Sequence, residues 1–239
     1  MIIIFGGSGT LGTEIIGSLK NKNALCIVAN KRYSDVVQHY NNKPNIKKIF
    51  KVNLENKSEL DFFLSESIKE YHYKISGIVL NFAKTLNQEN LDYSIEAEKV
   101  FRLNYGASAT IYSFFSNILQ NQNSQNKFRA VNVLSNAIST LNASSVHYLS
   151  SKAAIERMSS YYAKQYAKQM IINNVLPGLM PSSLTKQRYD TISNEIIKKT
   201  PIGRLSEPSE VAEIVRYLVS EVPLSVTGQS IYVDGGRTL

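Results

Sequence analysis

The sequence of 239 residues lacks the features that stabilise secreted proteins or anchor membrane proteins. It contains one cysteine, so no disulfide can form within the chain, which fits a reducing compartment. This residue, Cys26, lies in an apolar run and is expected to be buried in a strand. The apolar runs are too short to cross a bilayer, and the first residues have no basic signal-peptide region. We therefore expect a soluble, cytoplasmic protein with no membrane partner.

Patterns typical of metal sites and nucleic-acid interfaces are also missing. His39, His72 and His147 do not have the spacing of metal ligands, and one cysteine cannot complete a set, so no metal site is expected. The net charge of +8 favours anionic partners, such as phosphorylated cofactors and phosphorylated or acyl-carrier substrates. The basic residues are dispersed, and no tract mixes dense Lys and Arg with aromatic residues. The sequence therefore disfavours nucleic acid as a partner.

The chain has enough apolar residues for a full core, at 43%, and they fall in short runs that alternate with helical patterns. The predicted strands are residues 1–5, 24–29, 46–52, 75–82, 128–134, 171–176 and 229–233. The predicted helices are residues 13–20, 33–42, 58–71, 92–119, 148–170 and 209–220, and the region 92–119 is expected to bend near Gly106. This alternation indicates βαβ units with right-handed crossovers. We predict an α/β fold with one domain over residues 1–239, a Rossmann-type doubly wound parallel sheet of about seven strands with helices on both faces.

A glycine-rich turn, GGSGTLG, follows the first predicted strand. Glycines three residues apart permit a tight turn, let backbone N–H groups approach a pyrophosphate, and let the next helix pack close to the sheet. The N-terminus of that helix adds partial positive charge. Glycine-rich turns are common, but this position indicates a dinucleotide site. The residues expected to contact the cofactor are Gly6, Ser8, Gly9, Thr10, Leu11 and Gly12.

Basic residues follow the second predicted strand, where the chain reads Asn30-Lys31-Arg32 with no carboxylate before Asp35. In a dinucleotide fold, an acidic residue here binds the ribose 2′-hydroxyl of NAD(H), whereas basic residues accept the 2′-phosphate of NADP(H). The sequence therefore favours NADP(H) over NAD(H). The alternative is an ordinary solvated start of a helix.

The stretch Ser135–Lys152 carries the candidate chemistry. Tyr148 and Lys152 are four residues apart, so a helix places them on one face. An ammonium beside a phenol favours the phenolate, so we expect Lys152 to lower the pKa of Tyr148 toward a value that suits acid–base catalysis. Ser135 follows the fifth predicted strand and would orient a carbonyl or alcohol oxygen. The alternative is a surface tyrosine that packs on a lysine stem.

Three further positions leave alternatives open. Asn104 lies within the predicted helix 92–119, where its side chain competes for backbone hydrogen bonds. It either holds a water or distorts the helix, or it is simply exposed. Asn53, before Leu54, either contacts an adenine edge or begins a turn. Residues 179–200 follow the break at Pro177-Gly178 and form either a flap over the substrate or a surface excursion. Substrate specificity is expected to lie in residues 84–90, 138–147 and 179–200.

Together these motifs resemble the short-chain dehydrogenase/reductase family in its compact form, and in general pattern the bacterial 3-oxoacyl-carrier-protein reductases. The resemblance covers nearly the whole chain. It rests on the glycine-rich turn, on Asn104 in RLNYGAS, on the spacing of Ser135, Tyr148 and Lys152, and on Asn173–Gly178. The most specific match is the tail, PIGRLSEPSEVAEIVRYLVSEVPLSVTGQSIYVDGG.

Two segments depart from the family pattern. Thr10 stands where the family has its middle glycine, and the glycine spacing here is more similar to that of larger nucleotide-sugar enzymes. The Asn-Asn-Ala-Gly motif after the fourth strand reads Asn81-Phe82-Ala83-Lys84. We expect Phe82 and Lys84 to alter the floor beneath the nicotinamide ribose.

The resemblance implies an NADP(H)-dependent oxidoreductase that interconverts a ketone, such as a 3-oxoacyl thioester, and a secondary alcohol. Tyr148 would be the general acid and base, Lys152 would lower its pKa and hold the ribose, Ser135 would polarise the substrate oxygen, and Asn104 would anchor a water. Asn81, Ala83, Pro177 and Gly178 would contact the cofactor. The family also implies a homotetramer or homodimer.

Two other functions remain open. One is a catalytically inactive dinucleotide-binding regulator, for which the altered segment Asn81–Lys84 is the support. The other is a nucleotide-sugar epimerase or dehydratase, suggested by the glycine spacing. Those enzymes usually carry a longer C-terminal substrate domain, which we do not expect after Asp234-Gly235-Gly236.

Overall fold

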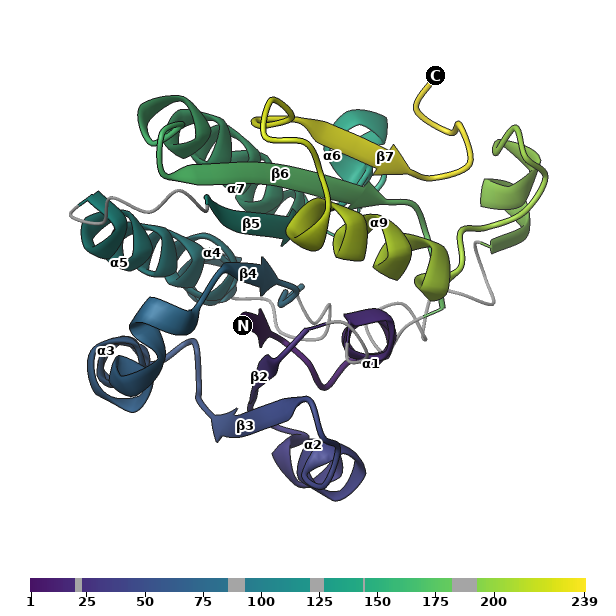
Figure 1. Ribbon diagram of the computed structural model, residues 1–239. Helices are drawn as coiled ribbons and strands as arrows, with labels where there is room; N and C mark the ends of the chain where they lie inside the picture. The colour runs from purple at the N-terminus through teal and green to yellow at the C-terminus, as the bar shows by residue number, and fades with distance from the viewer. Residues whose placement is uncertain (20–22, 86–92, 121–126, 144, 182–192) are drawn as a thin grey trace.

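Seven parallel strands form one sheet in the computed structural model, which describes residues 1–19, 23–85, 93–120, 127–143, 145–181 and 193–239. The strand order is β3-β2-β1-β4-β5-β6-β7, from the bottom to the top of Figure 1. The strands are β1 (Ile2–Phe5), β2 (Leu25–Ala29), β3 (Ile46–Lys51), β4 (Gly77–Leu80), β5 (Phe128–Val133), β6 (Met170–Pro177) and β7 (Ser230–Val233). The order reverses between β1 and β4, and sheets of this kind bind ligands at the carboxyl edge near that reversal.

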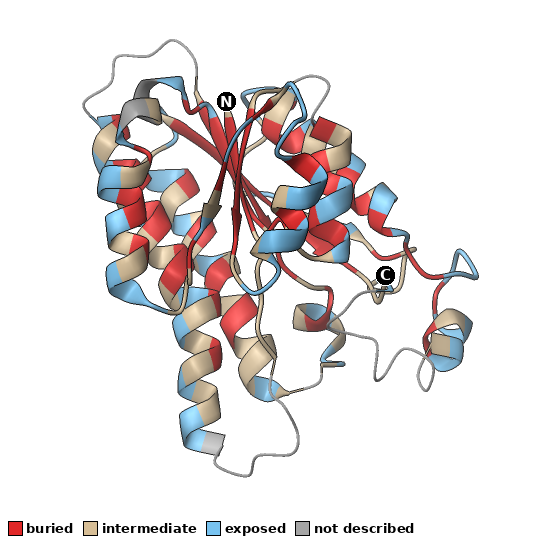
Figure 2. Ribbon diagram, turned by 90° about the horizontal axis from the view of Figure 1, so that it is seen from below, coloured by how far each residue is buried: buried red, intermediate tan, exposed pale blue. Residues whose placement is uncertain are grey.

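Helices cover both faces of the sheet, as Figure 2 shows by the red strands between two outer layers. One face carries α1 (Thr10–Leu19), α2 (Tyr33–Tyr40) and α9 (Pro208–Ser220). The other face carries α3 (Lys57–Phe62), α5 (Ser108–Gln120) and α7 (Val146–Gln165), with α4 (Tyr93–Phe101) beside α7. The short helix α6 (Ala137–Thr140) lies next to α7. The predicted α/β class, with a parallel sheet of seven strands between helices, is confirmed.

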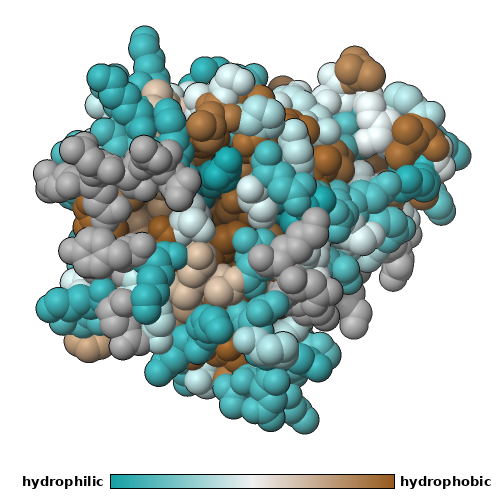
Figure 3. All heavy atoms as spheres, viewed as in Figure 1, coloured by the Kyte–Doolittle hydropathy of each residue, from teal (hydrophilic) through white to brown (hydrophobic). Residues whose placement is uncertain are grey.

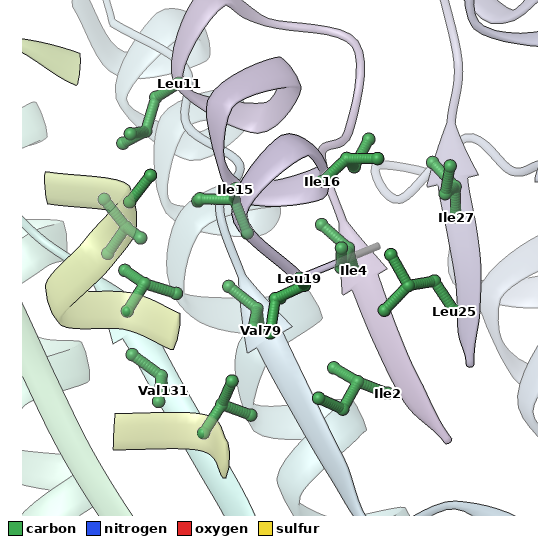
Figure 4. Close-up of a cluster of buried hydrophobic side chains, with 14 of the residues drawn as sticks. Ile2, Ile4, Leu11, Ile15, Ile16, Leu19, Leu25, Ile27, Val79 and Val131 are labelled. Carbon is green, nitrogen blue, oxygen red and sulfur yellow. The ribbon is translucent and has the colours of Figure 1, made fainter. Parts of the chain in front are cut away.

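Apolar runs make these strands because successive side chains enter the two cores alternately. In β1, Ile2 and Ile4 join the core under α1 and α9, while Ile3 and Phe5 join the opposite core. Figure 4 shows side chains of α1, including Leu19, packed toward β1 and β4. Each such side chain contributes about 1.5–3 kcal/mol when fully buried. Cys26 is fully buried in β2, as expected.

The prediction of a single helix over residues 58–71 is wrong. Helix α3 ends at Phe62, and it is followed by a π-helical turn, η1 (Phe63–Ser67), and a 3₁₀ helix, η2 (Lys69–Lys74). The predicted buried stripe, Leu60, Phe63, Leu64 and Ile68, is nevertheless buried. The apolar spacing therefore determines which side chains face the sheet, whereas packing decides the local helix type.

Two other long helices also differ from the prediction. The segment predicted over residues 92–119 consists of α4, a π-helical turn η3 (Arg102–Ala107) and α5. Helix α7 begins two residues before Tyr148, because Ser145 caps it by accepting a hydrogen bond from the Tyr148 backbone N–H. It ends at Gln165, and Met170, predicted to be helical, is the first residue of β6 and pairs with Phe128.

The exterior is mixed in polarity. Hydrophilic side chains cover much of the face in Figure 3, with smaller hydrophobic areas between them. Among the described residues, no helix combines the length and apolar character that a membrane span requires.

Two glycines of α1 have different surroundings, so replacing each one tests a different effect: close packing at Gly12 and helix propensity at Gly17. A Cβ on Gly12 would lie 2.5 Å from the Gly6 carbonyl oxygen, whereas one on Gly17 would have no neighbour within 4 Å. We expect Gly12→Ala to lower the free energy of unfolding by roughly 1–3 kcal/mol, because it forces the helix away from the turn. Gly17→Ala should raise it by roughly 0.5–1 kcal/mol. Urea unfolding of both variants measures this. Equal stabilities would contradict the close approach of Gly12 to Gly6.

Candidate active site

A cavity of about 230 Å³ lies where the carboxyl ends of β1, β4, β5 and β6 meet. Its wall combines the glycine-rich turn, the segments after these strands, the start of α7 and the C-terminal tail. The lining residues are Gly9, Thr10, Leu11, Asn81, Phe82, Ala83, Thr85, Val133, Leu134, Ser135, Asn136, Ala137, Thr140, Asn142, Ala143, Tyr148, Lys152, Pro177, Gly178, Leu179, Met180, Ile196 and Arg237.

The glycine-rich turn reaches this cavity by close backbone contacts. Gly6 has a φ of +84°, and a Cβ there would lie 2.2 Å from the Asn81 carbonyl oxygen. The Asn81 side chain donates a hydrogen bond to the Gly6 carbonyl at 3.0 Å. Gly9, in contrast, has open space where a Cβ would be and lines the cavity beside the N-terminus of α1. Gly6 and Gly12 therefore permit packing, and Gly9 leaves the backbone accessible to a ligand.

Ser135 and Tyr148 meet at the wall of the cavity, as their spacing in the sequence suggests. Ser135 follows β5, and its side chain lies beside the Tyr148 phenol. The Ser135 hydroxyl accepts from the Ala137 backbone N–H at 3.2 Å, which fixes its orientation. Burial raises the pKa of Tyr148, and the neighbouring Ser135 hydroxyl lowers it in part. The phenol therefore stays protonated at neutral pH in the absence of a ligand.

Lys152 is buried, with 3% of its surface exposed. Its Nζ donates to the Val133 carbonyl at 2.8 Å and to the Phe82 carbonyl at 3.4 Å. Burial lowers the Lys152 pKa to about 7. The Nζ lies 6.0 Å from the centroid of the Tyr148 ring. The expected lowering of the Tyr148 pKa by Lys152 is not found, because the amine faces backbone carbonyls and burial dominates the phenol.

Asn104 is fully buried within the π-helical turn η3. Its Oδ1 accepts from the Lys84 backbone N–H at 2.8 Å, and its Nδ2 donates to the Lys84 carbonyl at 3.0 Å and to the Ser151 hydroxyl at 2.9 Å. The exposed-position alternative is therefore wrong. The side chain ties the segment after β4 to α7 next to Lys152, and the anchoring of a water stays a prediction.

The two unusual residues of the segment Asn81–Lys84 point in different directions. Phe82 lines the cavity, whereas the Lys84 side chain does not. Instead, the Lys84 Nζ forms a partly buried ion pair with Glu55, at 3.0 Å and 3.1 Å from its two carboxylate oxygens. Of the two replacements, Phe82 alone lies in the described cavity wall, and an effect of either residue on the floor beneath the nicotinamide ribose stays a prediction.

Several predicted cofactor residues lie outside this cavity: Gly6, Ser8, Gly12, Asn30, Lys31, Arg32, Asn53 and Leu54. Lys31 and Arg32 are exposed after β2, and the Arg32 Nε pairs with Asp35 at 2.8 Å. The Asn53 Oδ1 accepts from the Glu55 backbone N–H at 3.2 Å, which fits the turn interpretation of this residue. Both segments follow strands at the carboxyl edge, where an extended ligand would continue beyond the cavity.

Sequence reasoning missed part of the wall. The missed residues are Asn136, Ala137 and Arg237. They follow β5 or β7 at the carboxyl edge, so their position behind a predicted strand is a usable signal. The wall also includes residues of the three segments predicted to determine specificity, namely Thr85, Thr140, Asn142, Ala143, Met180 and Ile196. Residues 182–192 of the predicted substrate loop lie outside the described residues.

The described residues contain no group of three or more His, Cys, Asp or Glu side chains that could hold a metal ion. The cavity wall carries hydroxyl, phenol, amide, amine and guanidinium groups.

Comparisons with known proteins agree on one family. A family model described as "Enoyl-(Acyl carrier protein) reductase" matches residues 11–238. The chain is 25% identical over 240 residues to 3-oxoacyl-[acyl-carrier-protein] reductase FabG of Haemophilus influenzae, covering 99% of this chain and 97% of that protein.

Solved structures give the same fold. One is a short-chain type dehydrogenase/reductase from Mycobacterium ulcerans, with a TM-score of 0.86, 19% identity, and coverage of 99% of this chain and 89% of that one. Another is the Pseudomonas aeruginosa RhlG/NADP active-site complex, with a TM-score of 0.85, 22% identity, and coverage of 100% of this chain and 96% of that one.

The burial of Lys152 predicts a stability that depends on pH. Its pKa is about 7 in the folded protein and near 10.5 when unfolded. Between pH 7 and pH 10.5, Lys152 binds a proton in the unfolded chain but not in the folded protein, so the free energy of unfolding rises with pH. Below about pH 7, Lys152 is protonated in both states, and the cost of burying the ammonium is fully present. Between pH 7 and pH 9, the free energy of unfolding of wild type should rise by about 2 kcal/mol more than that of Lys152→Met.

Urea unfolding of the protein without nucleotide at both pH values measures this difference. Lys164→Met, which removes an exposed lysine from the same helix, is the control and should follow wild type. If wild type and Lys152→Met show the same pH dependence, the amine is not buried in the folded protein.

Proposed function

Because the chain belongs to the short-chain dehydrogenase/reductase family of oxidoreductases, we propose that it interconverts a ketone and a secondary alcohol with NADP(H). The observation that carries this proposal is the placement of the neighbouring Ser135 and Tyr148 hydroxyls in one cavity with the buried amine of Lys152. These groups are the hydroxyl, the proton donor and the cation that reduction of a carbonyl needs.

The cavity fits the nicotinamide end of a dinucleotide. The open backbone at Gly9 and the N-terminus of α1 suit a phosphate, and the Lys152 amine suits ribose hydroxyls. Lys31 and Arg32 suit a 2′-phosphate, and the RhlG complex, of the same fold, contains NADP. When bound, NADP(H) supplies or accepts the hydride.

The protein residues then orient the ketone and move a proton. Ser135 and Tyr148 donate hydrogen bonds to the ketone oxygen. As the carbonyl carbon gains the hydride, Tyr148 gives its proton to the oxygen, and the resulting phenolate takes a proton from solvent. Asn104 is a positioning residue, because it holds the segment after β4 against α7 without touching the cavity.

The substrate class is a ketone with an apolar part. The wall beyond Tyr148 includes Leu134, Leu179, Met180 and Ile196, which would contact an alkyl group. A 3-oxoacyl thioester fits this wall, and the relative from Haemophilus influenzae is named a 3-oxoacyl-[acyl-carrier-protein] reductase. The loop over residues 179–200 is proposed to complete this substrate site.

We propose further that residues 1–239 act as one cytoplasmic domain that assembles into a homotetramer or homodimer. Exposed aromatic residues support an assembly, among them Tyr105 of η3, Tyr161 of α7, Tyr217 of α9 and Tyr232 of β7.

Loss of the Tyr148 hydroxyl should abolish reduction. We expect Tyr148→Phe to lower NADPH-dependent turnover of a panel of ketones and 3-oxoacyl thioesters by roughly 10²–10⁴-fold, because no other described hydroxyl pairs with Ser135 at the cavity. The loss is measured from NADPH absorbance. Tyr161→Phe, an exposed tyrosine of the same helix, is the matched control. Undiminished turnover in Tyr148→Phe would refute the mechanism, and NADPH binding without turnover in wild type would favour the inactive regulator.

The basic residues after β2 should set the cofactor preference. Replacing Lys31 and Arg32 with alanine together should raise the KM for NADPH roughly 10- to 100-fold, because charge-assisted hydrogen bonds to the 2′-phosphate are lost. The KM for NADH, which has no such phosphate, should change by a few-fold at most. The Lys43→Ala/Lys47→Ala variant removes two exposed charges before and within β3 and should leave both values unchanged. An equal rise of the KM values for NADPH and NADH would show that Lys31 and Arg32 do not bind the 2′-phosphate.

A further inference from the structure

The wall of the cavity carries positive charge that no carboxylate balances. Its charged residues are Lys152 and Arg237, and the described lining contains no Asp or Glu. Lys152 donates to two backbone carbonyls. Arg237 has one hydrogen bond, from its backbone N–H to the Asp234 carbonyl at 3.4 Å. Its guanidinium has neither an ion pair nor a hydrogen bond with any residue that the structure describes, so its donors are available to a ligand.

Arg237 is nevertheless not on a loose tail. The Asp234 carboxylate accepts from the Asn136 side chain and from the Gly236 backbone N–H, both at 3.1 Å. The Gly235 carbonyl accepts from the Ile202 backbone N–H at 3.2 Å. Gly235 and Gly236 have φ values of +68° and +83°, which only glycine adopts easily. The backbone that leads to Arg237 is therefore held on one side by the residue after Ser135 and on the other by residues 200–202.

The place of Arg237 in the sheet separates it from the proposed phosphate site. It follows β7, which is four strand spacings from β1 and its glycine-rich turn. At about 4.8 Å per spacing, the two strands are roughly 19 Å apart. Arg237 lines the cavity that holds Ser135 and Tyr148, and it follows the strand farthest from the glycine-rich turn, so we place an anion bound to it on the substrate side.

We propose that Arg237 binds an anionic group of the substrate while Ser135 and Tyr148 hold its ketone oxygen. This inference rests on the proposed function and narrows its substrate class. The planar guanidinium offers paired donors that match a carboxylate or a phosphate. The anion is either the carboxylate of a free oxo acid or the phosphate of a pantetheine thioester, and the two sources are separable by experiment.

Binding of charged and neutral probes tests the proposal without turnover. The probes are acetoacetate and methyl acetoacetate, and acetoacetyl-pantetheine with and without its 4′-phosphate. Titration calorimetry gives their dissociation constants with the whole chain, in the presence and in the absence of NADP⁺. Wild type should bind the anionic member of one pair about 10- to 100-fold more tightly, because charge-assisted hydrogen bonds form. Added salt should reduce this preference.

Variants assign the preference to the guanidinium. Arg237→Gln should reduce the ratio of the two affinities to about one, and Arg237→Lys, which keeps the charge, should restore part of it. Lys47→Gln removes an exposed charge at the opposite edge of the sheet and should leave the ratio unchanged. A purely structural role of Arg237 would weaken both members of a pair equally.

Each outcome decides the question. A preference for acetoacetate identifies a free oxo acid, and a preference within the pantetheine pair alone identifies the thioester phosphate. Equal affinities in both pairs, no binding of any probe, or a preference that survives Arg237→Gln overturns the proposal. Reduction of methyl acetoacetate by NADPH, lost in Tyr148→Phe, tests the reductase separately. Turnover without charge preference would thus refute the role of Arg237 alone, and charge preference without turnover would refute the reductase alone.

Discussion

The buried amine of Lys152 is the constraint on which the arrangement of the cavity depends. An ammonium removed from water costs several kcal/mol unless acceptors surround it. Its acceptors are the carbonyls of Val133, at the end of β5, and Phe82, just after β4. These strands are neighbours, so one side chain spans the junction between them. Helix α7 must therefore keep its first half against the carboxyl ends of β4 and β5, and Tyr148, one turn before Lys152, is held beside Ser135.

The segment after β4 is held through its backbone. Asn104 is hydrogen-bonded to the backbone N–H and the carbonyl of Lys84, so this contact does not depend on which side chain residue 84 carries. The Lys84 side chain turns toward Glu55 and leaves the cavity wall unchanged. The π-helical turn η3 carries Asn104 and buries its side chain. A local misfit in the sequence is thus the means by which two distant segments are joined.

Charge within the cavity follows from the same edge of the sheet. The proposed hydride chemistry uses Lys152 on the cofactor side, while Arg237 lies after the last strand on the substrate side. Apolar side chains such as Leu134 and Met180 also line the cavity, and a low dielectric there strengthens any interaction with an anion. The net charge of +8 is dispersed over the chain, so the absence of a carboxylate from the described wall, more than the total charge, bears on the ligand.

The sequence by itself determined the strands, the parallel α/β class and the residues Ser135, Tyr148 and Lys152, because hydrophobic periodicity and the spacing of functional groups along a helix are local properties. It did not determine that the helix ends at Gln165 and that Met170 begins β6, since strand pairing with Phe128 overrides helix propensity. The pKa of Tyr148, the partners of Asn104 and Lys84, and the presence of Arg237 at the cavity were decided only by the tertiary structure. Each depends on burial or on contacts between segments far apart in the chain, and the spacing of neighbouring residues in the sequence predicts neither.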